Sequence, residues 1–537
     1  MTAKNILFIM CDQLRFDYLG CAGHPYIKTP HIDALAARGV RFDRAYVQSP
    51  ICGPSRMSFY TGRYVRSHGS TWNNFPLRVG EMTIGDHLRP LGVRTALCGK
   101  THMAADVEGM RRLGIDPASE MGCLISECGF EVWDRLDGLH PPGGKEPTHY
   151  QDHLRAEGFD SDNPWHDWAN AAEDSDGALL SGWLMEHADK PARVAEEHSE
   201  TPYATSRAME FIADAGDTPW CLHLSYIKPH WPYIVPAPYH NMYGPGDVIP
   251  VNRSEAEQNG AHPVFAAYQQ HRFSQVFARD EVRDRVIPAY MGLITQIDDQ
   301  IGRLMAFLDD RGLTESTLIV FTSDHGDYLG DHWLGEKELF HDASSRIPLI
   351  VVDPTEGADA TRGTVNGDLV EAIDLAPTFV DWAGGTPPAH ILEGRSLLSL
   401  IRGQGGDWRR YAISEYDYSA RKARKMLGQP IPDCRLVMVT DGRWKMTHAE
   451  GFRPMLFDME TDPEELHDLG EDPGQAATID RLTDAMNRWA RAHHNRVTIS
   501  DAEIDARSGG ELRRGYIIGF WDQAELDAAR ADGESGN

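Results

Sequence analysis

The sequence lacks the marks of a membrane protein. No stretch approaches the ~20 consecutive apolar residues that a transmembrane helix requires. The apolar run at residues 6–10 is too short for the hydrophobic core of a signal peptide. The eight cysteines show no paired CxxC spacing, so a zinc site built from them is not expected. We therefore expect no membrane partner, a cytoplasmic location and mostly free thiols.

Basic residues are scarce relative to acidic ones. Lys and Arg together number 52 against 81 Asp and Glu, which gives a formal net charge of −29 at pH 7. A nucleic-acid backbone requires a basic face, so this balance argues against nucleic acid as a partner. An anionic small molecule could still bind in a pocket where a few cations overcome the global field.

The predicted strands alternate with predicted helices. Apolar runs predict strands at residues 4–11, 40–46, 95–98, 220–225, 317–322 and 347–352. Helices are predicted at 30–38 with Thr29 as its cap, at 55–61, 82–91, 203–215 and 373–383, and at 280–311 with a break or kink at Pro288. The alternation predicts an α/β fold with a large, mostly parallel sheet and helices on both faces.

Three parts of the chain differ in character. Residues 1–405 carry the α/β pattern, with a stretch at about 105–195 that we interpret as lids, insertions or substrate walls. Residues 406–500 predict a smaller α+β subdomain, with a β-hairpin across Asp441-Gly442 and an amphipathic helix at 477–493. The polar tail at 501–537 is predicted to pack on another subunit.

Two of the predicted strands end in polar residues that can bind a metal ion. Asp12 and Gln13 follow the first strand, and Asp324 and His325 follow a strand more than 300 residues later. Function in open α/β sheets gathers at the carboxyl ends of the strands, so these side chains could converge on one divalent cation. Each pair taken alone can equally be a helix cap or a turn.

The segment Cys52-Gly53-Pro54-Ser55-Arg56, followed by a short helix and Thr61-Gly62, resembles the signature of the sulfatases in the alkaline phosphatase superfamily. Five further blocks stand in the family order: Asp12-Gln13-Leu14-Arg15-Phe16-Asp17, Thr29-Pro30-His31-Ile32-Asp33, Gly99-Lys100-Thr101-His102, Lys228-Pro229-His230-Trp231-Pro232, and Ser323-Asp324-His325-Gly326 with Lys337. The resemblance covers most of the chain. It implies an alkaline-phosphatase-like domain and membership of the group of formylglycine-dependent arylsulfatases and phosphonate monoester hydrolases.

The resemblance implies that Cys52 is modified. In the family a maturation enzyme oxidises the motif cysteine to formylglycine, whose aldehyde hydrates to a gem-diol. One hydroxyl attacks sulfur and displaces the alcohol, and the other loses its proton so that the covalent hemiacetal expels sulfate. Without modification, Cys52 would be a thiol nucleophile or a small buried core residue.

By the same resemblance, one divalent metal ion is bound by Asp12, Gln13, Asp324, His325 and the modified Cys52. Many sulfatases have Asp and Asn where this chain has Gln13 and His325, and such oxygen ligands suit Ca²⁺. Imidazole shifts the preference toward transition ions, so Mn²⁺ is favoured and Ca²⁺ stays open. The ion would lower the pKa of the nucleophile, neutralise charge and orient the substrate.

Three cations and two histidines are expected around the reacting group. The resemblance implies that Arg56 holds the formylglycine region, while Lys100 and Lys337 bracket the sulfuryl oxygens. Cations at these positions act in the transition state, where charge grows on the leaving oxygen. His102 is the expected base for collapse of the hemiacetal, and His230 is the expected acid or hydrogen-bond donor at the leaving oxygen.

Asn73, in Trp72-Asn73-Asn74-Phe75, is a further candidate for binding the developing anion. It can equally be a turn residue. Taken one at a time, the other candidates are more often surface cations or core histidines, and only their occurrence together within the motif blocks favours the catalytic interpretation.

The sequence is thus interpreted as a hydrolase of aryl or alkyl sulfate monoesters that acts on small molecules. The alternative is a phosphonate monoester hydrolase or phosphodiesterase of the same superfamily, with activity toward both ester types. Those enzymes generally lack the block that holds Lys100 and His102 here. An inactive relative is disfavoured because the metal acids and Cys52 are present, and Cys at position 52 argues against a plain phosphatase. A homo-oligomer, dimer or tetramer, is expected.

Overall fold

The computed structural model describes residues 4–141, 148–492, 494, 496–507, 517 and 519–534. Residue contacts divide the chain into two units, Met1–Pro387 with Leu392–His493 and Pro388–Ile391 with His494–Asn537. The first unit holds the sheets and most of the helices. The second holds α17 (Asp501–Arg507) and α18 (Gln523–Glu534).

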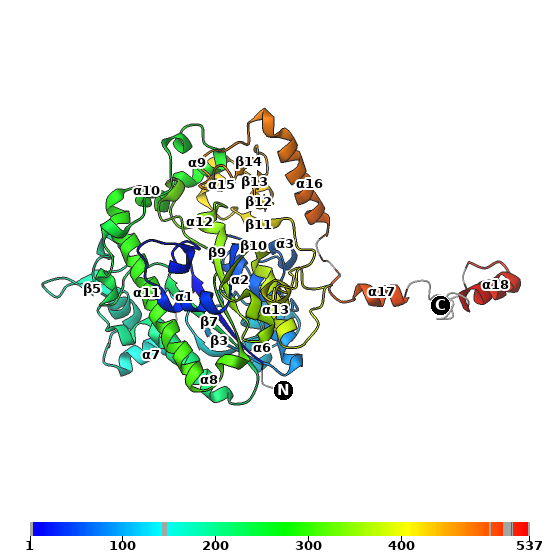
Figure 1. Cartoon of the computed structure of the whole chain (residues 1–537), viewed down its shortest axis with the longest axis horizontal. Helices are drawn as coiled ribbons and strands as arrows, with labels where there is room; N and C mark the ends of the chain where they lie inside the picture. Colours follow the sequence, from blue (N-terminus) through cyan, green and yellow to red (C-terminus); the bar gives the residue numbers. More distant parts are fainter. Residues whose placement is uncertain are drawn as a thin grey trace. The chain divides into compact units, whose positions relative to one another are not determined.

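A sheet of eight strands forms the centre of the first unit, in the order β10-β2-β9-β8-β1-β7-β3-β4 (Figure 1). The strands are β1 (Asn5–Asp12), β2 (Val40–Tyr46), β3 (Arg94–Gly99), β4 (Glu131–Arg135), β7 (Trp220–Pro229), β8 (Thr317–Ser323), β9 (Arg346–Val352) and β10 (Thr364–Glu371). Only β9 runs antiparallel to its neighbours within this sheet. The predicted mostly parallel sheet is confirmed, whereas β4 and β10 were not predicted.

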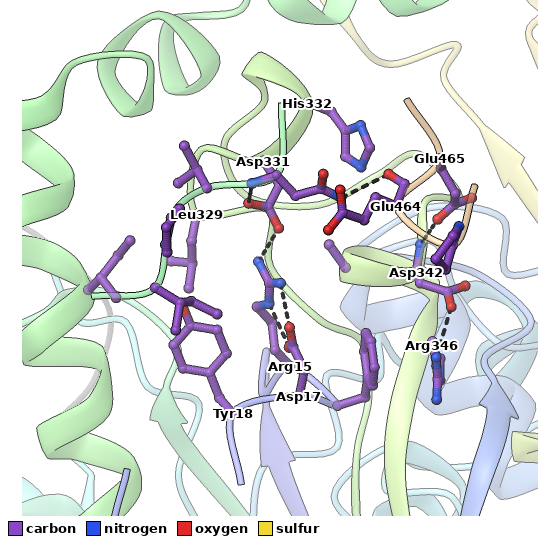
Figure 2. A pocket seen from close by; sticks show the side chains of 18 residues that line it. Arg15, Asp17, Tyr18, Leu329, Asp331, His332, Asp342, Arg346, Glu464 and Glu465 are labelled. Atoms are coloured by element: carbon purple, nitrogen blue, oxygen red, sulfur yellow. Dashed lines mark hydrogen bonds and ion pairs between the residues drawn. The ribbon is translucent and has the colours of Figure 1, made fainter. Parts of the chain in front are cut away.

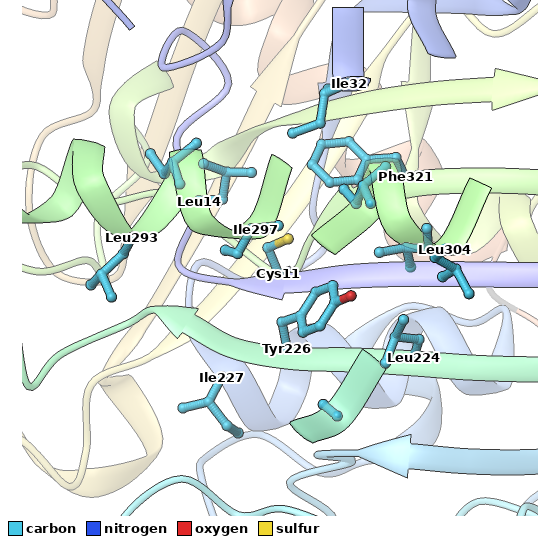
Figure 3. Close-up of a cluster of buried hydrophobic side chains, with 14 of the residues drawn as sticks. Cys11, Leu14, Ile32, Leu224, Tyr226, Ile227, Leu293, Ile297, Leu304 and Phe321 are labelled. Atoms are coloured by element: carbon cyan, nitrogen blue, oxygen red, sulfur yellow. The ribbon is translucent and has the colours of Figure 1, made fainter. Parts of the chain in front are cut away.

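Helices cover both faces of the sheet, as predicted. The helices are α1 (Pro30–Arg38), α8 (Glu200–Ala215) and α11 (Asp280–Asp310) on one face, and α2 (Cys52–Thr61), α4 (Ile84–Leu88) and α13 (Leu375–Trp382) on the other. Alternate residues of β1 enter opposite cores. Leu7 and Ile9 pack with the first set of helices, and Ile6 and Phe8 pack with the second set. Figure 3 shows part of the first cluster, which includes Cys11 of β1 with Leu293 and Ile297 of α11.

Two local predictions in the helices are corrected in part or in full. Helix α11 continues through Pro288 as one helix, so the predicted alternative of a break is wrong, while a kink at Pro288 stays a prediction. The Thr29 side chain does not cap α1. The carboxylate of Asp298, on α11, accepts hydrogen bonds from the backbone N–H groups of His31 at 3.1 Å and Ile32 at 2.7 Å. A side chain remote in sequence therefore satisfies the free donors at the start of α1.

The stretch at 105–195 contains more regular structure than its composition indicated. It supplies β4, which extends the edge of the central sheet beside β3. It also forms α5 (Val107–Arg112), α6 (Glu120–Ser126), α7 (His149–Ala156), and the short strands β5 (Ala171–Glu173) and β6 (Leu179–Ser181). We refer to this stretch as the insertion.

A second, antiparallel sheet forms the smaller C-terminal subdomain that the sequence predicted. Its strands are β11 (Ala412–Asp417), β12 (Arg435–Thr440), β13 (Trp444–Ala449) and β14 (Met455–Asp458), in that order. The β12–β13 hairpin confirms the predicted turn at Asp441-Gly442. The predicted amphipathic helix is α16 (Ala476–Ala492), which packs on this sheet through Leu482.

The boundary at residue 405 and the role of the tail at 501–537 in oligomer contacts stay predictions. Of that tail, residues 508–516, 518 and 535–537 lie outside the described residues. Within the described part of the chain, none of the helices has both the length and the apolar character needed to cross a bilayer.

Candidate active site

Cys52 is the first residue of α2 and lies where the central strands end. Its Sγ is 3.1 Å from His325 Nε2 and 3.8 Å from Asp12 Oδ1. The helix begins three residues earlier than predicted, with the extended residue Ile51 before it, and ends at Gly62, whose φ of 64° favours glycine. The fold thereby places a buried thiol at the carboxyl edge of the sheet.

The pairing of β1 with β8 brings the two acidic strand ends together. Cys11 of β1 pairs with Ser323 of β8, so the residues that follow are neighbours in space. The backbone N–H of Gln13 donates to Asp324 Oδ1 at 3.0 Å. The two carboxylates of Asp12 and Asp324 are fully buried, which is costly without positive charge close by.

Four buried residues can each present one ligand atom to a common centre: Asp12, Cys52, Asp324 and His325. These atoms all lie within 4.8 Å of one another. His325 Nε2 is 3.8 Å from an Asp12 oxygen and 3.7 Å from an Asp324 oxygen. Two carboxylates and one imidazole are buried and converge on one point, and this donor set fits a divalent metal ion.

Arg56 is fully buried between the two carboxylates. Its Nε donates to Asp324 Oδ2 at 2.7 Å, and its Nη2 lies 3.4 Å from Asp12 Oδ2. A further nitrogen, Nη1, donates to the backbone oxygen of Lys100 at 2.6 Å and to Ser225 Oγ at 2.8 Å. Arg56 therefore compensates the negative charge of Asp12 and Asp324, and its hydrogen bonds link residues near the carboxyl ends of the central strands. It does not face open space.

Two lysines flank Cys52. Lys100 Nζ lies 2.5 Å from Asp12 Oδ2. Lys337 Nζ donates to Gln13 Oε1 at 2.6 Å and lies 3.2 Å from His230 Nε2. The sequence placed these residues in blocks more than 100 positions apart, and the structure brings them together around residue 52.

The charges around Cys52 favour its anionic form. Burial alone would raise the pKa of the thiol, but the nearby charges of Lys337 and Lys100 outweigh burial and hold this pKa well below its usual range. Burial works against the ammonium of Lys337 too, yet the charges of Cys52 and neighbouring carboxylates raise its pKa. The centre is thus built to hold negative charge at residue 52.

The imidazole of His102 is close enough to the Cys52 thiol to contribute to lowering the pKa of that thiol. Burial, together with the charge of Lys100, lowers the pKa of His102, so its imidazole is neutral near pH 7 and can accept a proton. Its Nδ1 is buried and has no hydrogen-bond partner among the described residues. Near Lys337, Nδ1 of His230 lies 2.6 Å from the backbone oxygen of Trp231.

Two predicted site residues are engaged elsewhere. Asn73 Oδ1 accepts a hydrogen bond from the backbone N–H of Gly53 at 2.7 Å, so this side chain supports the first turn of α2. The Gln13 side chain donates to Asp327 and accepts from Lys337. Their roles as an oxyanion donor and a metal ligand stay predictions.

The sequence did not reveal the residues that hold Gln13 in place. Asp327 is fully buried and accepts hydrogen bonds from the Gln13 amide and from the Tyr233 hydroxyl, the latter at 3.1 Å. The hydroxyl of Tyr290, on α11, donates to the Gln13 backbone oxygen at 2.8 Å and accepts from the Arg15 N–H at 2.9 Å. Asp327 stands three residues after Asp324, which is a usable signal, whereas Tyr290 lies inside a long helix and had none.

A cavity of about 240 Å³ opens beside the loops that follow β1 and β8 (Figure 2). Its lining is rich in carboxylates: Asp17, Asp331, Asp342, Glu464 and Glu465. Arg15 also lines it, but its guanidinium is paired with Asp17 and Asp331, each at 2.7 Å. The four potential metal ligands do not line this cavity. A cavity of this charge is poorly suited to an anionic group.

Comparison with known proteins gives consistent matches. The sulfatase family model matches residues 4–385, and a model of the C-terminal part of N-sulphoglucosamine sulphohydrolase matches residues 330–492. The multifunctional alkaline phosphatase superfamily protein PehA of Trinickia caryophylli is 33% identical over 93% of this chain and 97% of its own. An arylsulfatase of Clostridium perfringens is 28% identical over 96% and 98%. The phosphonate monoester hydrolase SpPMH of Silicibacter pomeroyi superposes with a TM-score of 0.81 at 30% identity, covering 92% and 97% of the two chains.

Proposed function

The chain belongs to the sulfatase family of the alkaline phosphatase superfamily, and from this premise we propose that it hydrolyses aryl or alkyl sulfate monoesters at residue 52. The observation that carries the proposal is the position of Cys52. Its sulfur touches His325 and Asp12 on the metal-binding side, and the cations Lys100 and Lys337 face the same point. A sulfate monoester is anionic, so a buried position held by cations suits its sulfuryl group.

We further propose that Cys52 is oxidised to formylglycine by a maturation enzyme of the host. The hydrated aldehyde supplies one hydroxyl that can attack sulfur and a second that can lose its proton to release sulfate. The motif Cys52-Gly53-Pro54-Ser55-Arg56 supports the modification. Mass spectrometry of the peptide that contains residue 52 tests it, since an unmodified thiol in active enzyme would contradict the proposal.

The surrounding side chains have separate tasks in this reaction. Lys100 and Lys337 stabilise the sulfuryl oxygens as charge moves toward the leaving group. Neutral His102 takes the proton that leaves residue 52 when sulfate is released, because its imidazole is buried near that side chain and its lowered pKa leaves it free to accept a proton. His230, beside Lys337, donates to the oxygen of the departing alcohol.

A single divalent ion would be held by Asp12, Asp324, His325, Gln13 and residue 52. When bound, it supplies Lewis acidity that lowers the pKa of the nucleophile and neutralises substrate charge. We propose Mn²⁺, with Ca²⁺ as the alternative, because His325 adds an imidazole to the carboxylate ligands. Elemental analysis of purified enzyme distinguishes the two ions.

Hydrolysis of phosphonate monoesters is the second candidate function. The similarity to SpPMH supports it, because it extends over nearly the full length of both chains at a TM-score of 0.81. The block that contains Lys100 and His102 favours the sulfatase. The test is the ratio of kcat/KM for 4-nitrophenyl sulfate to that for a phenyl phosphonate monoester. A ratio above one is expected, and a ratio far below one would make the phosphonate ester the primary substrate class.

A further inference from the structure

A second cluster of metal-binding side chains stands apart from the Cys52 centre and shares no residue with it. His153 lies in α7 of the insertion, and Glu157 follows the end of that helix. His198 ends the short 3₁₀ turn Glu196–His198, directly before α8. Each residue can present one ligand atom such that all three atoms lie within 4.8 Å of one another.

The local fold brings these three side chains together. His153 and Glu157 are four residues apart, a spacing that places both on one side of a helical turn. The Tyr150 hydroxyl donates to the backbone oxygen of His198 at 2.8 Å and so ties the turn before α8 to α7. The imidazoles of His153 and His198 have ring centroids 5.8 Å apart. The His153 ring also packs on Tyr203, at 4.9 Å between centroids.

The histidines are prepared to act as ligands. Nδ1 of His198 is buried and has no hydrogen-bond partner among the described residues. A buried nitrogen without a partner is unfavourable, and a ligand there would satisfy it. A neutral imidazole keeps one ring nitrogen with a lone pair that can coordinate a metal ion.

We propose that His153, Glu157 and His198 bind a Zn²⁺ ion, which joins α7 of the insertion to the segment that begins α8. Two imidazole nitrogens and one carboxylate oxygen are a common ligand set for zinc, with a water molecule in the fourth position. Ligands of a tetrahedral zinc ion lie ~3.3 Å apart, so the side chains must close on the ion. Glu157 is exposed and can move at little cost.

Zinc is favoured over the ions expected at the Cys52 centre. Two of the three ligands here are imidazoles, which bind Zn²⁺, Ni²⁺ and Cu²⁺ in preference to Ca²⁺ or Mg²⁺. The Cys52 centre has two carboxylates for one imidazole and therefore a harder donor set. The zinc site does not depend on the proposed reaction, since it shares no ligand with that centre.

The experiment compares zinc binding by the full-length, metal-loaded enzyme and by matched variants. ZnCl₂ is titrated calorimetrically into the wild type, His198→Ala, His153→Gln and the control His149→Ala. His149 lies on the same helix α7, its side chain is 73% exposed, and it is outside the cluster. Each protein is also melted with and without ZnCl₂. Any zinc that displaces the catalytic ion appears equally in all four proteins.

We expect one binding event in the wild type and in His149→Ala that is at least tenfold weaker or absent in His198→Ala and His153→Gln. The rise in Tm with ZnCl₂ should be lost in the same two variants. Circular dichroism and turnover of 4-nitrophenyl sulfate without zinc check that they are folded. Equal isotherms and equal Tm shifts in the wild type and His198→Ala would overturn the proposal.

Discussion

The ammonium of Lys337 is hydrogen-bonded to the side-chain oxygen of Gln13 at 2.6 Å, although the two residues stand 324 positions apart. This contact connects the loop after β1 to the loop after β8. It also orients a cation toward Cys52, whose pKa it lowers. The bond gives Gln13 a role in positioning Lys337 that does not depend on metal binding.

Replacing Lys337 with an uncharged residue of similar length should impair the chemical step. Lys337→Met removes one of the cations that hold negative charge at residue 52, so kcat should fall by about 10²–10³-fold. The exposed Lys425 provides the control, because Lys425→Met changes the net charge equally outside the site. Steady-state kinetics with 4-nitrophenyl sulfate measure both variants. A Lys337→Met enzyme within threefold of the wild type would contradict the assigned role.

Cys52→Ala should remove turnover while leaving the fold intact. Loss of the nucleophile costs about four orders of magnitude or more in kcat. The side chain is small, so alanine leaves little empty volume in the buried site. Activity assays and far-UV circular dichroism measure the two effects, with the exposed Cys123→Ala as control. A Cys52→Ala protein that keeps most of its activity would refute covalent catalysis at residue 52.

His102→Ala should separate cleavage of the ester from release of sulfate. The variant keeps Lys100 and Lys337, so the first alcohol should be released in a burst. Release of sulfate should then stall, because the proposed base near residue 52 is missing. Intact-mass spectrometry after mixing with substrate should detect a sulfated protein. Absence of both the burst and the adduct would count against this role.

Removal of the metal should affect both activity and stability. Asp12, Asp324 and His325 converge within a fully buried site, where Arg56 and Lys100 compensate part of the negative charge. Dialysis against a chelator should abolish turnover, and Mn²⁺ should restore it better than Ca²⁺. An ion at 100 times its Kd stabilises the fold by about 2.7 kcal/mol, which a thermal melt resolves. Full activity in protein shown by elemental analysis to be metal-free would contradict a metal-dependent reaction.

The sequence predicted which residues gather at the carboxyl edge of the sheet better than it predicted the edge strands of the fold. Asp12 and Asp324 were expected to meet because parallel strands end at one edge of a sheet, and the Cys11–Ser323 pairing fulfils that geometry. Strand β10 was missed because Thr364–Glu371 is largely exposed and contains Asn, Gly and Asp, which are rare in strands. Strand β4 was missed for a similar reason, since three of its five residues are charged.

Contacts that exist only in the folded chain could not be predicted. Asn73 stays a candidate for oxyanion binding, and its side-chain oxygen accepts a hydrogen bond from the Gly53 N–H, a contact that the sequence did not indicate. Asp298 replaces Thr29 as the cap of α1 across more than 260 residues. Both side chains contact partners that sequence spacing does not reveal. Motif context therefore indicated which candidate groups gather around Cys52, but not the side chains that hold them in place.

Glu127 is a buried carboxyl that contacts the loop carrying His102, and its ionisation makes the stability of the fold depend on pH. It is buried, accepts a hydrogen bond from Thr101 Oγ1 at 2.6 Å and pairs with Arg135. Burial outweighs these partners and raises the pKa of Glu127 from 4.5 to about 7. In the unfolded chain the carboxyl has its ordinary pKa, so between pH 4.5 and about 7 the folded state binds more protons.

The free energy of unfolding should therefore fall as pH rises through that window, by up to about 3 kcal/mol from this group. Glu127→Gln keeps an acceptor for Thr101 and carries no titrating proton. The difference between the Tm of Glu127→Gln and the Tm of the wild type should therefore rise, in favour of the variant, from pH 5 to pH 8. The exposed Glu120→Gln, on α6, should show no such trend. A Tm difference for Glu127→Gln that is constant across this range would show that Glu127 ionises normally, because only a shifted proton equilibrium couples the substitution to pH.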